Sequence, residues 1–193
     1  MPCVFIRLTG CHLRCTYCDT EYAFHEGTWM SLDEIAARVR DYGCPLVEIT
    51  GGEPLLQPAV HPLMTRLCDD GYTVLLETSG ACDIAAVDRR VVRIVDLKCP
   101  SSGECARNLF DNVADLRPAD EVKFVVGDRP DYDWAREIID RFALSGRCAI
   151  LLSPVHGRLA ADELAAWVLA DRLSVRVQVQ LHKVIWSPEA RGV

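Results

Sequence analysis

The sequence predicts an α/β fold, an incomplete TIM-type β/α barrel with about six parallel strands. Short apolar runs alternate with segments of helical periodicity along the whole chain, and strands joined by crossover helices pair in parallel. The 193 residues, half of them hydrophobic, suffice for one buried core, so we expect a single domain over 1–193. Unusual residues follow several expected strands, and such folds carry their chemistry at the carboxyl ends of strands.

The first half of the chain begins with a strand, a cysteine-rich loop and a helix. Val4 to Thr9 is β-branched and aromatic and ends at Gly10. Ser31 and Glu34 have the spacing of a capping box, and the apolar residues that follow share one helical face until Gly43. The further elements expected in this half are strands over 46–50, 73–77 and 93–97, a helix over 60–70, and a short helix before the fourth strand.

The second half continues the alternation of strands and helices. Strands are expected over 121–126 and 149–152, and helices over 132–143 and 160–173. Residues 175–180 are a candidate for a further strand. Six or seven parallel strands do not close a barrel, so its wall stays open on one side.

The composition excludes several classes of protein. A net charge of -7 with no basic run disfavours a nucleic-acid surface. The sequence contains neither an apolar stretch long enough for a membrane span nor a secretory leader. In such a chain, ten cysteines indicate reduced thiols and metal ligation rather than disulfides. We therefore expect a cytoplasmic protein with neither a nucleic-acid nor a membrane partner.

Three cysteines, Cys11, Cys15 and Cys18, follow the first expected strand. Three thiolates at these spacings can hold three corners of a four-iron, four-sulfur (4Fe-4S) cluster and leave the fourth iron open. The alternative is a structural zinc site, which normally needs four ligands and a second cysteine pair at similar spacing. The other seven cysteines are scattered, which is typical of small buried side chains, so the spacing favours a cluster.

A glycine-rich run follows the second expected strand, from Thr50 through Gly51, Gly52 and Glu53 to Pro54. Two glycines let the backbone approach a ligand closely, while the glutamate and exposed peptide groups offer partners to an ammonium group. Alone, such a run is more often an ordinary tight turn. Its place one strand after the cysteine loop favours a ligand-binding role.

Together the cysteine triad and the glycine run resemble the radical S-adenosylmethionine (SAM) enzymes. Longer motifs extend the likeness over nearly the whole chain to one of their families, the 7-carboxy-7-deazaguanine synthases. The motifs are Phe5-Ile-Arg-Leu-Thr-Gly-Cys11, Cys18-Asp-Thr20, Thr50-Gly-Gly-Glu-Pro-Leu-Leu-Gln57, Glu77-Thr-Ser-Gly80, Asp96-Leu-Lys-Cys-Pro-Ser-Ser-Gly103, Glu121-Val-Lys-Phe124, Ser153-Pro-Val-His-Gly157 and Gln180-Leu-His-Lys183. The last four distinguish this family best.

The resemblance implies a lyase that contracts the ring of 6-carboxy-5,6,7,8-tetrahydropterin with loss of ammonia, on the route to queuosine in tRNA. It also implies a 4Fe-4S cluster, SAM, Mg2+, a reductant such as flavodoxin or ferredoxin, and a homodimer. The domain would be a radical SAM core with its cluster loop over 11–18 and a C-terminal extension over 174–193. The cofactor carries the radical chemistry, while the protein orients the reactants and excludes water.

The same resemblance implies roles for individual residues. Cys11, Cys15 and Cys18 would hold the cluster, and Thr20 would be a magnesium ligand. Arg7 and Thr50 would contact the substrate. The expected SAM contacts are Gly52, Glu53, Ser79, Asp96, Leu97, Lys98, Ser153, Pro154, Val155 and His156.

Each of these residues also has a simpler interpretation. Asp19 and Thr20 are suited to capping a turn, and Arg7 to a surface ion pair. Asp96 and Lys98 share one face of a strand and can form a local ion pair. A serine before a glycine, such as Ser79, is common in turns. His156, His182 and Lys183 are compatible with exposed loop or strand-end positions.

Two departures from the family pattern concern the ends of the chain. Family members usually carry a Gln-Gly-Glu-Gly segment that helps to form the substrate pocket, whereas this sequence starts at Met1, almost on the first strand. We expect that the natural start lies earlier or that the segment was not included. The tail runs past Pro188, which takes the place of a substrate contact in some members.

Two other functions stay open from the sequence. An activating enzyme for a glycyl radical protein shares the cysteine spacing, the small size and the glycine run. The other possibility is a non-catalytic iron-sulfur or zinc module. The Cys-Asp-Thr and Ser-Pro-Val-His-Gly runs favour the pterin enzyme over the activating enzyme. Iron and sulfide content after anaerobic reconstitution, together with reductive cleavage of SAM, would separate it from the non-catalytic module.

Overall fold

A computed structural model describes residues 1–191 and contains one curved sheet of parallel strands, in the order β1-β2-β3-β4-β5-β6-β7. The strands are β1 (Val4–Leu8), β2 (Leu46–Gly51), β3 (Thr73–Thr78), β4 (Val92–Asp96), β5 (Glu121–Val126), β6 (Ala149–Pro154) and β7 (Arg176–Val177). The helices are α1 (Leu32–Asp41), α2 (Val60–Asp69), α3 (Arg129–Arg141), α4 (Ala161–Asp171) and α5 (Leu181–Ile185). Because β1 and β7 are not paired, the barrel is open, as the sequence predicts.

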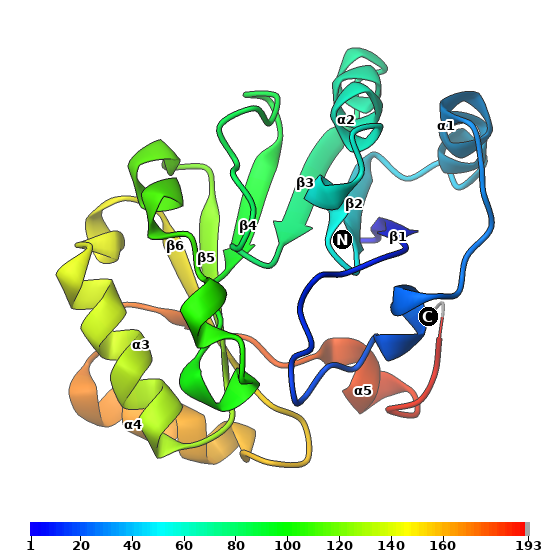
Figure 1. The fold of residues 1–193 in the computed structure, drawn as a ribbon. Coiled ribbons are helices and arrows are strands. Elements are labelled where there is room, and N and C mark those ends of the chain that lie inside the picture. The colour runs from blue at the N-terminus through cyan, green and yellow to red at the C-terminus, as the bar shows by residue number, and fades with distance from the viewer. Residues whose placement is uncertain (192–193) are drawn as a thin grey trace.

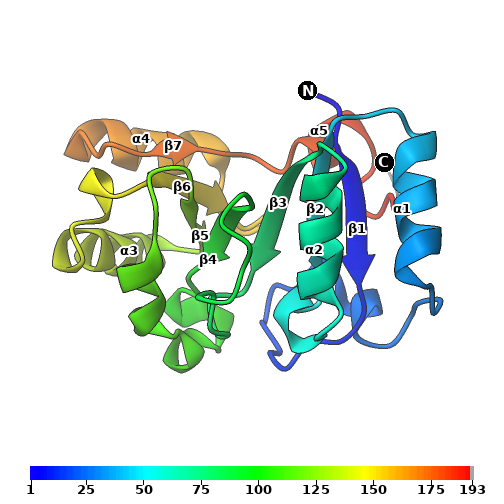
Figure 2. The same cartoon turned by 90° about the horizontal axis from the view of Figure 1, so that it is seen from above.

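The two faces of the sheet differ in polarity because side chains alternate along each strand. On β5, Val122, Phe124 and Val126 are fully buried in the core. Glu121, Lys123 and Val125 lie on the opposite, inner face. Figures 1 and 2 show helices α1 to α4 outside the curved sheet, whereas α5 and the loop after β1 lie on its open, concave side.

Caps and turns define the helix ends. The capping box predicted from Ser31 and Glu34 is present at α1. Helix α3 begins at Arg129, earlier than expected, because the Asp128 side chain accepts a hydrogen bond from the Asp131 backbone N–H. The short helix expected before β4 is absent from the described chain. There the side chains of Asp83 and Asp88 accept hydrogen bonds from backbone N–H groups two residues later, which stabilises turns instead.

The expected strand over 175–180 is another correction. Only Arg176–Val177 pairs with β6, and the chain then leaves the sheet and forms α5, so Lys183 lies on a helix rather than at a strand end. Gln180 and Lys183 bind the Asp19 carboxylate, with N–O distances of 2.6 and 2.7 Å. These contacts draw the C-terminal segment across the open side of the sheet toward the loop after β1 (Figure 1).

In the described part of the chain, six short 3-10 helices also lie in the connections, namely η1 (Glu21–Phe24), η2 (Pro54–Leu56), η3 (Pro100–Ser102), η4 (Cys105–Arg107), η5 (Phe110–Asp115) and η6 (Leu144–Gly146). The first four lie in loops that follow the carboxyl ends of strands. Within residues 1–191, the helices lack the combination of length and apolar character that a bilayer span requires.

Candidate active site

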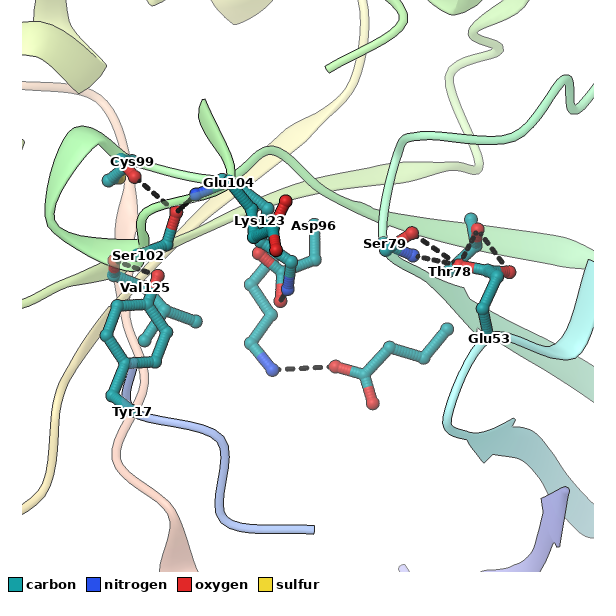
Figure 3. A network of polar contacts seen from close by, with 12 residues as sticks. Tyr17, Glu53, Thr78, Ser79, Asp96, Cys99, Ser102, Glu104, Lys123 and Val125 are labelled. Atoms are coloured by element: carbon teal, nitrogen blue, oxygen red, sulfur yellow. Dashed lines mark hydrogen bonds and ion pairs between the residues drawn. The ribbon is translucent and has the colours of Figure 1, made fainter. Parts of the chain in front are cut away.

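The cysteine loop after β1 extends across the carboxyl ends of the strands. The Thr16 N–H and hydroxyl group donate to the carbonyl oxygens of Ser102 and Ser101, at 3.0 and 2.7 Å. The Tyr17 hydroxyl group donates to the Val125 carbonyl at the end of β5, at 3.3 Å (Figure 3). The Arg14 N–H donates to the Glu104 side chain at 2.6 Å. The loop is thus attached to the segment after β4 and to the end of β5.

Cys11, Cys15 and Cys18 are partly buried on this loop. Burial raises the pKa of Cys15 to about 11 and also raises the pKa of Cys18. The Cys15 and Cys18 thiols therefore stay protonated at neutral pH, and iron must displace their protons to bind. The Leu13 N–H points at the Cys11 sulfur at 3.4 Å, and such hydrogen bonds tune iron-sulfur centres. The thiol set and this donor fit a cluster held by the loop.

The described residues contain no group of three cysteine, histidine or acidic side chains that converges on one metal ion. A cubane cluster does not need such convergence, because its three cysteines bind three different iron atoms.

The glycine pair after β2 lies directly against the cysteine loop. A Cβ atom on Gly51 would lie 2.1 Å from the Leu8 carbonyl oxygen, and one on Gly52 would lie 2.1 Å from the Gly10 carbonyl oxygen. The Gly52 N–H donates to Leu8 and the Glu53 N–H to Gly10, at 2.9 and 2.7 Å. We expected the glycines to let backbone approach a ligand. The structure shows that they let it approach the base of the cysteine loop.

The Glu53 carboxylate, predicted to contact SAM, lies in a buried network of hydrogen bonds. Its side chain is completely buried and accepts hydrogen bonds from the Thr78 hydroxyl group and from the Ser79 N–H and hydroxyl group (Figure 3). The Ser79 hydroxyl donor, expected at the cofactor ribose, is also used in this contact, at 2.5 Å. The Glu53 side chain also accepts a hydrogen bond from the Leu55 N–H. These bonds connect the glycine run to the end of β3.

Asp96 at the end of β4 differs from Glu53, because only one of its carboxylate oxygens has a partner. Its Oδ2 atom pairs with the Lys98 ammonium group at 2.8 Å, so the predicted local ion pair is present. Its Oδ1 atom is buried and has no hydrogen-bond partner. A buried unpaired acceptor costs about 1–3 kcal/mol, which a ligand with hydroxyl or ammonium donors would recover. This orphaned oxygen fits a donor-rich cofactor such as SAM.

Leu97 lies between these two residues, and its side chain faces away from them. Its side chain is 1% exposed and packs in the core, because alternate residues of a strand face opposite sides. Only its backbone remains available for the predicted cofactor contact, and the Leu97 N–H already donates to the Lys123 carbonyl at 2.9 Å.

The segment at the end of β6 carries the remaining residues predicted to contact SAM. Ser153, Pro154 and Val155 are buried, and the Val155 N–H donates to the Val126 carbonyl at 2.8 Å. His156, the next residue, is exposed, as the simpler interpretation of this histidine expects. The structure therefore places this run at the same edge of the sheet as Asp96.

Three of the four residues predicted to contact substrate or magnesium are Arg7 on β1, Thr20 in the loop after β1 and Pro188 near the C-terminus. Arg7 is exposed and forms no salt bridge with the described residues, so the surface ion pair is not present; its guanidinium lies 6.0 Å from the Tyr22 ring centroid. The Thr20 hydroxyl group donates to Asp19 Oδ1 at 2.9 Å. Pro188 lies after α5 in the exposed C-terminal segment.

Two polar side chains on the inner face, Glu77 and Lys123, were missing from the predicted site residues. Glu77 on β3 accepts hydrogen bonds from Lys123 on β5 at 2.7 Å and from Thr50 on β2 at 3.1 Å. Burial tends to raise the pKa of Glu77, but the Lys123 ammonium group and the Thr50 hydroxyl group hold it below its ordinary value. The sequence signal was present, since Lys123 lies between Val122 and Phe124, and Glu77 directly follows an apolar run that ends at Leu76.

Comparison with known proteins agrees with this architecture. Residues 5–99 match the profile of the radical SAM superfamily. A 7-carboxy-7-deazaguanine synthase of Chlorobaculum tepidum is 48% identical, and the match covers 100% of this chain and 89% of that protein. One of Koribacter versatilis is 47% identical, with 100% and 92% covered.

Solved structures share the fold at low sequence identity. The crystal structure of QueE from Escherichia coli superposes with a TM-score of 0.73 at 22% identity, covering 93% of this chain and 85% of that one. SuiB of Streptococcus suis bound to its precursor peptide SuiA has a TM-score of 0.67 at 12% identity, covering 92% and 48%. With the two full-length relatives, these observations show that the chain belongs to the 7-carboxy-7-deazaguanine synthase family of radical SAM proteins.

Proposed function

We propose that this protein is a 7-carboxy-7-deazaguanine synthase, which converts 6-carboxy-5,6,7,8-tetrahydropterin to 7-carboxy-7-deazaguanine with loss of ammonia. The observation that carries the proposal is the likeness over the full chain to relatives of that name, at 48 and 47% identity. A glycyl radical activating enzyme or a non-catalytic module is not favoured by these relatives. The geometry of the barrel mouth supports the assignment. The cysteine loop is hydrogen-bonded to the segment that follows Asp96, and the buried Oδ1 atom of Asp96 has no hydrogen-bond partner.

In this proposal the protein residues bind, orient and shield the reactants. Cys11, Cys15 and Cys18 hold the cluster, and Asp96 receives donors of the cofactor through its free Oδ1 atom. When bound, the cluster and SAM supply the one-electron chemistry that starts the rearrangement. Arg7 can bind the substrate carboxylate, for which a guanidinium group is a suitable planar partner.

Mg2+ is proposed as a further cofactor beside the cluster and SAM. Thr20 donates its hydroxyl proton to Asp19 Oδ1, which leaves the lone pairs of its oxygen free for a cation. Asp19 is fixed in turn by Lys183 and Gln180 of the C-terminal segment. Mg2+ prefers oxygen ligands and retains several waters, so one hydroxyl group and a substrate carboxylate are suitable partners.

Partners and location remain predictions. The homodimer has a candidate surface on α5, where Leu181, Val184 and Ile185 are 57–69% exposed. Light scattering during gel filtration would determine the oligomeric state. The flavodoxin or ferredoxin reductant, the cytoplasmic location and the route to queuosine also remain predictions.

The proposed activity can be tested with reconstituted protein under anaerobic conditions. The reduced protein is incubated with SAM, Mg2+ and carboxytetrahydropterin, and products are identified by mass spectrometry. We expect 7-carboxy-7-deazaguanine and ammonia from the wild-type protein and none from Cys15→Ala. SAM cleavage that is independent of the pterin, without deazaguanine product and with the cluster intact, would contradict the assignment.

A further inference from the structure

Two acidic side chains from neighbouring strands lie close together inside the barrel. Glu77 on β3 faces the inner side beside Thr50 and binds both Thr50 and Lys123. Glu48 lies two residues before Thr50 on β2, so its side chain points to the same inner face one layer lower. Glu48 is mostly shielded from solvent and forms no salt bridge with the described residues.

The groups around Glu48 come from three strands and from the segment before β1. They are Arg7 on β1, Glu77 on β3, Lys123 on β5 and the Cys3 thiol. The ammonium group of Lys123 is already engaged with Glu77 at 2.7 Å, so a second carboxylate at this position lacks its own counterion. Like charges in a shielded site disfavour double ionisation, and one proton remains on the pair.

The direction of the pKa shifts indicates which carboxyl group keeps the proton. Burial, followed by the neighbouring Glu77 carboxylate, raises the pKa of Glu48 to about 7, against the opposing effect of Lys123 and Arg7. The pKa of Glu77 stays below its ordinary value because Lys123 and Thr50 stabilise its charged form against burial. The environment therefore separates the pKa values of the two carboxyl groups, and Glu48 is the one that keeps the proton.

We propose that Glu48 is a positioning residue of this site. Its protonated carboxyl group donates a hydrogen bond to Glu77 and thereby holds Glu77, Thr50 and Lys123 in one arrangement. The inference rests on the proposed function, in which Thr50 and Arg7 contact a carboxylated pterin. Loss of the Glu48 proton places a second negative charge beneath an anionic substrate, so substrate binding weakens above neutral pH.

The pH dependence of KM for carboxytetrahydropterin tests the proposal. In the wild-type protein we expect KM to rise above pH 7, by up to roughly tenfold per pH unit if only the protonated form binds. Glu48→Gln is neutral at every pH and its amide can still donate to Glu77, so its KM should remain flat between pH 6 and pH 8.5. A rise in this variant parallel to that of the wild-type protein would overturn the proposal.

A matched control is available on the same inner face. Glu121 on β5 pairs with the largely exposed Arg176 instead of with Glu77 or Lys123. Glu121→Gln should therefore retain the wild-type rise of KM with pH.

Infrared spectroscopy tests the protonated pair without any turnover. The reconstituted wild-type protein should show the C=O stretch of a protonated carboxyl group that is lost between pH 6 and pH 8.5. Glu48→Gln should lack this band, while Glu121→Gln should keep it. If the wild-type protein makes no deazaguanine product, the proposed function fails but the infrared result still decides the state of Glu48. An unchanged band in Glu48→Gln would refute the inference.

Discussion

Two buried carboxylates at the mouth of the barrel differ in how completely they are hydrogen-bonded. Glu53, after β2, accepts hydrogen bonds from Leu55, Thr78 and Ser79. Asp96, at the end of β4, pairs with Lys98 through one oxygen, while the other is buried without a partner. Burial alone therefore does not indicate a binding residue. The fully bonded carboxylate fixes the scaffold, and the partly bonded one retains capacity for a ligand.

Replacing Glu53 should give the largest effect on stability. Glu53→Ala would leave several buried donors without an acceptor, each loss costing about 1–3 kcal/mol, so we expect the free energy of unfolding to fall by about 3 kcal/mol or more. Urea denaturation monitored by circular dichroism would measure the change. Glu26→Ala is the control, because that side chain is 64% exposed and, within residues 1–191, its one ion pair is with Arg191. Equal stability of the two variants would contradict the scaffold role of Glu53.

Replacing Gly52 should disturb the cysteine loop. In Gly52→Ala the new Cβ atom would meet the Gly10 carbonyl at 2.1 Å, so the loop must shift. We expect the reconstituted variant to bind less iron and sulfide than the wild-type protein. Gly146→Ala is the matched control, since a Cβ atom there meets nothing within 4 Å. Full cluster content in Gly52→Ala would show that the close contact is not needed.

Asp96→Asn should separate binding from folding. The substitution preserves shape but weakens the acceptor, and hydrogen bonds to charged groups contribute about 1.5–3 kcal/mol, so the Kd for SAM should rise by about tenfold or more. The loss of stability should be smaller than in Glu53→Ala. Equilibrium binding of SAM to the anaerobic, reconstituted protein would measure this. An unchanged Kd would remove Asp96 from the cofactor site.

The smallest effect concerns the Asp19–Lys183 pair. Burial tends to raise the pKa of Asp19, but Lys183, Thr20 and Gln180 lower it to about 2. Because the pKa in the folded state is depressed, this stabilisation is present above the unfolded pKa near 4 and is lost as pH falls toward 2.

Asp19 is 40% exposed, so Lys183→Met should lower the free energy of unfolding by at most about 1 kcal/mol at pH 6. Denaturation of both proteins across pH 2–6 would measure the difference. A stability gap that persists unchanged at pH 2 would exclude this ion pair as its origin.

Much of the fold was accessible from the sequence because the strands are short, apolar and regularly spaced. The capping box at Ser31 and the strand over 121–126 are confirmed at their predicted positions. The helix expected before β4 was wrong because the Asp83 and Asp88 side chains stabilise turns. The strand expected over 175–180 ended early because Gln180 and Lys183 are held by Asp19, which is distant in sequence.

The site was predicted less completely, since its chemistry depends on contacts between strands. The sequence motifs identified Glu53 and Asp96 equally, and only the three-dimensional contacts show that one is fully bonded while the other is not. The partnership of Glu48 with Glu77 and Lys123 needs the register of β2 and β3 and the sheet order through β5, which local patterns do not specify.

The most direct test of the account is whether SAM binds at the mouth between the cysteine loop and Asp96. The electron paramagnetic resonance signal of the reduced, reconstituted cluster would be recorded during titration with SAM. We predict that SAM changes the signal of the wild-type protein, and that Asp96→Asn needs a higher SAM concentration for the same change. A wild-type signal that does not respond to saturating SAM would contradict the account.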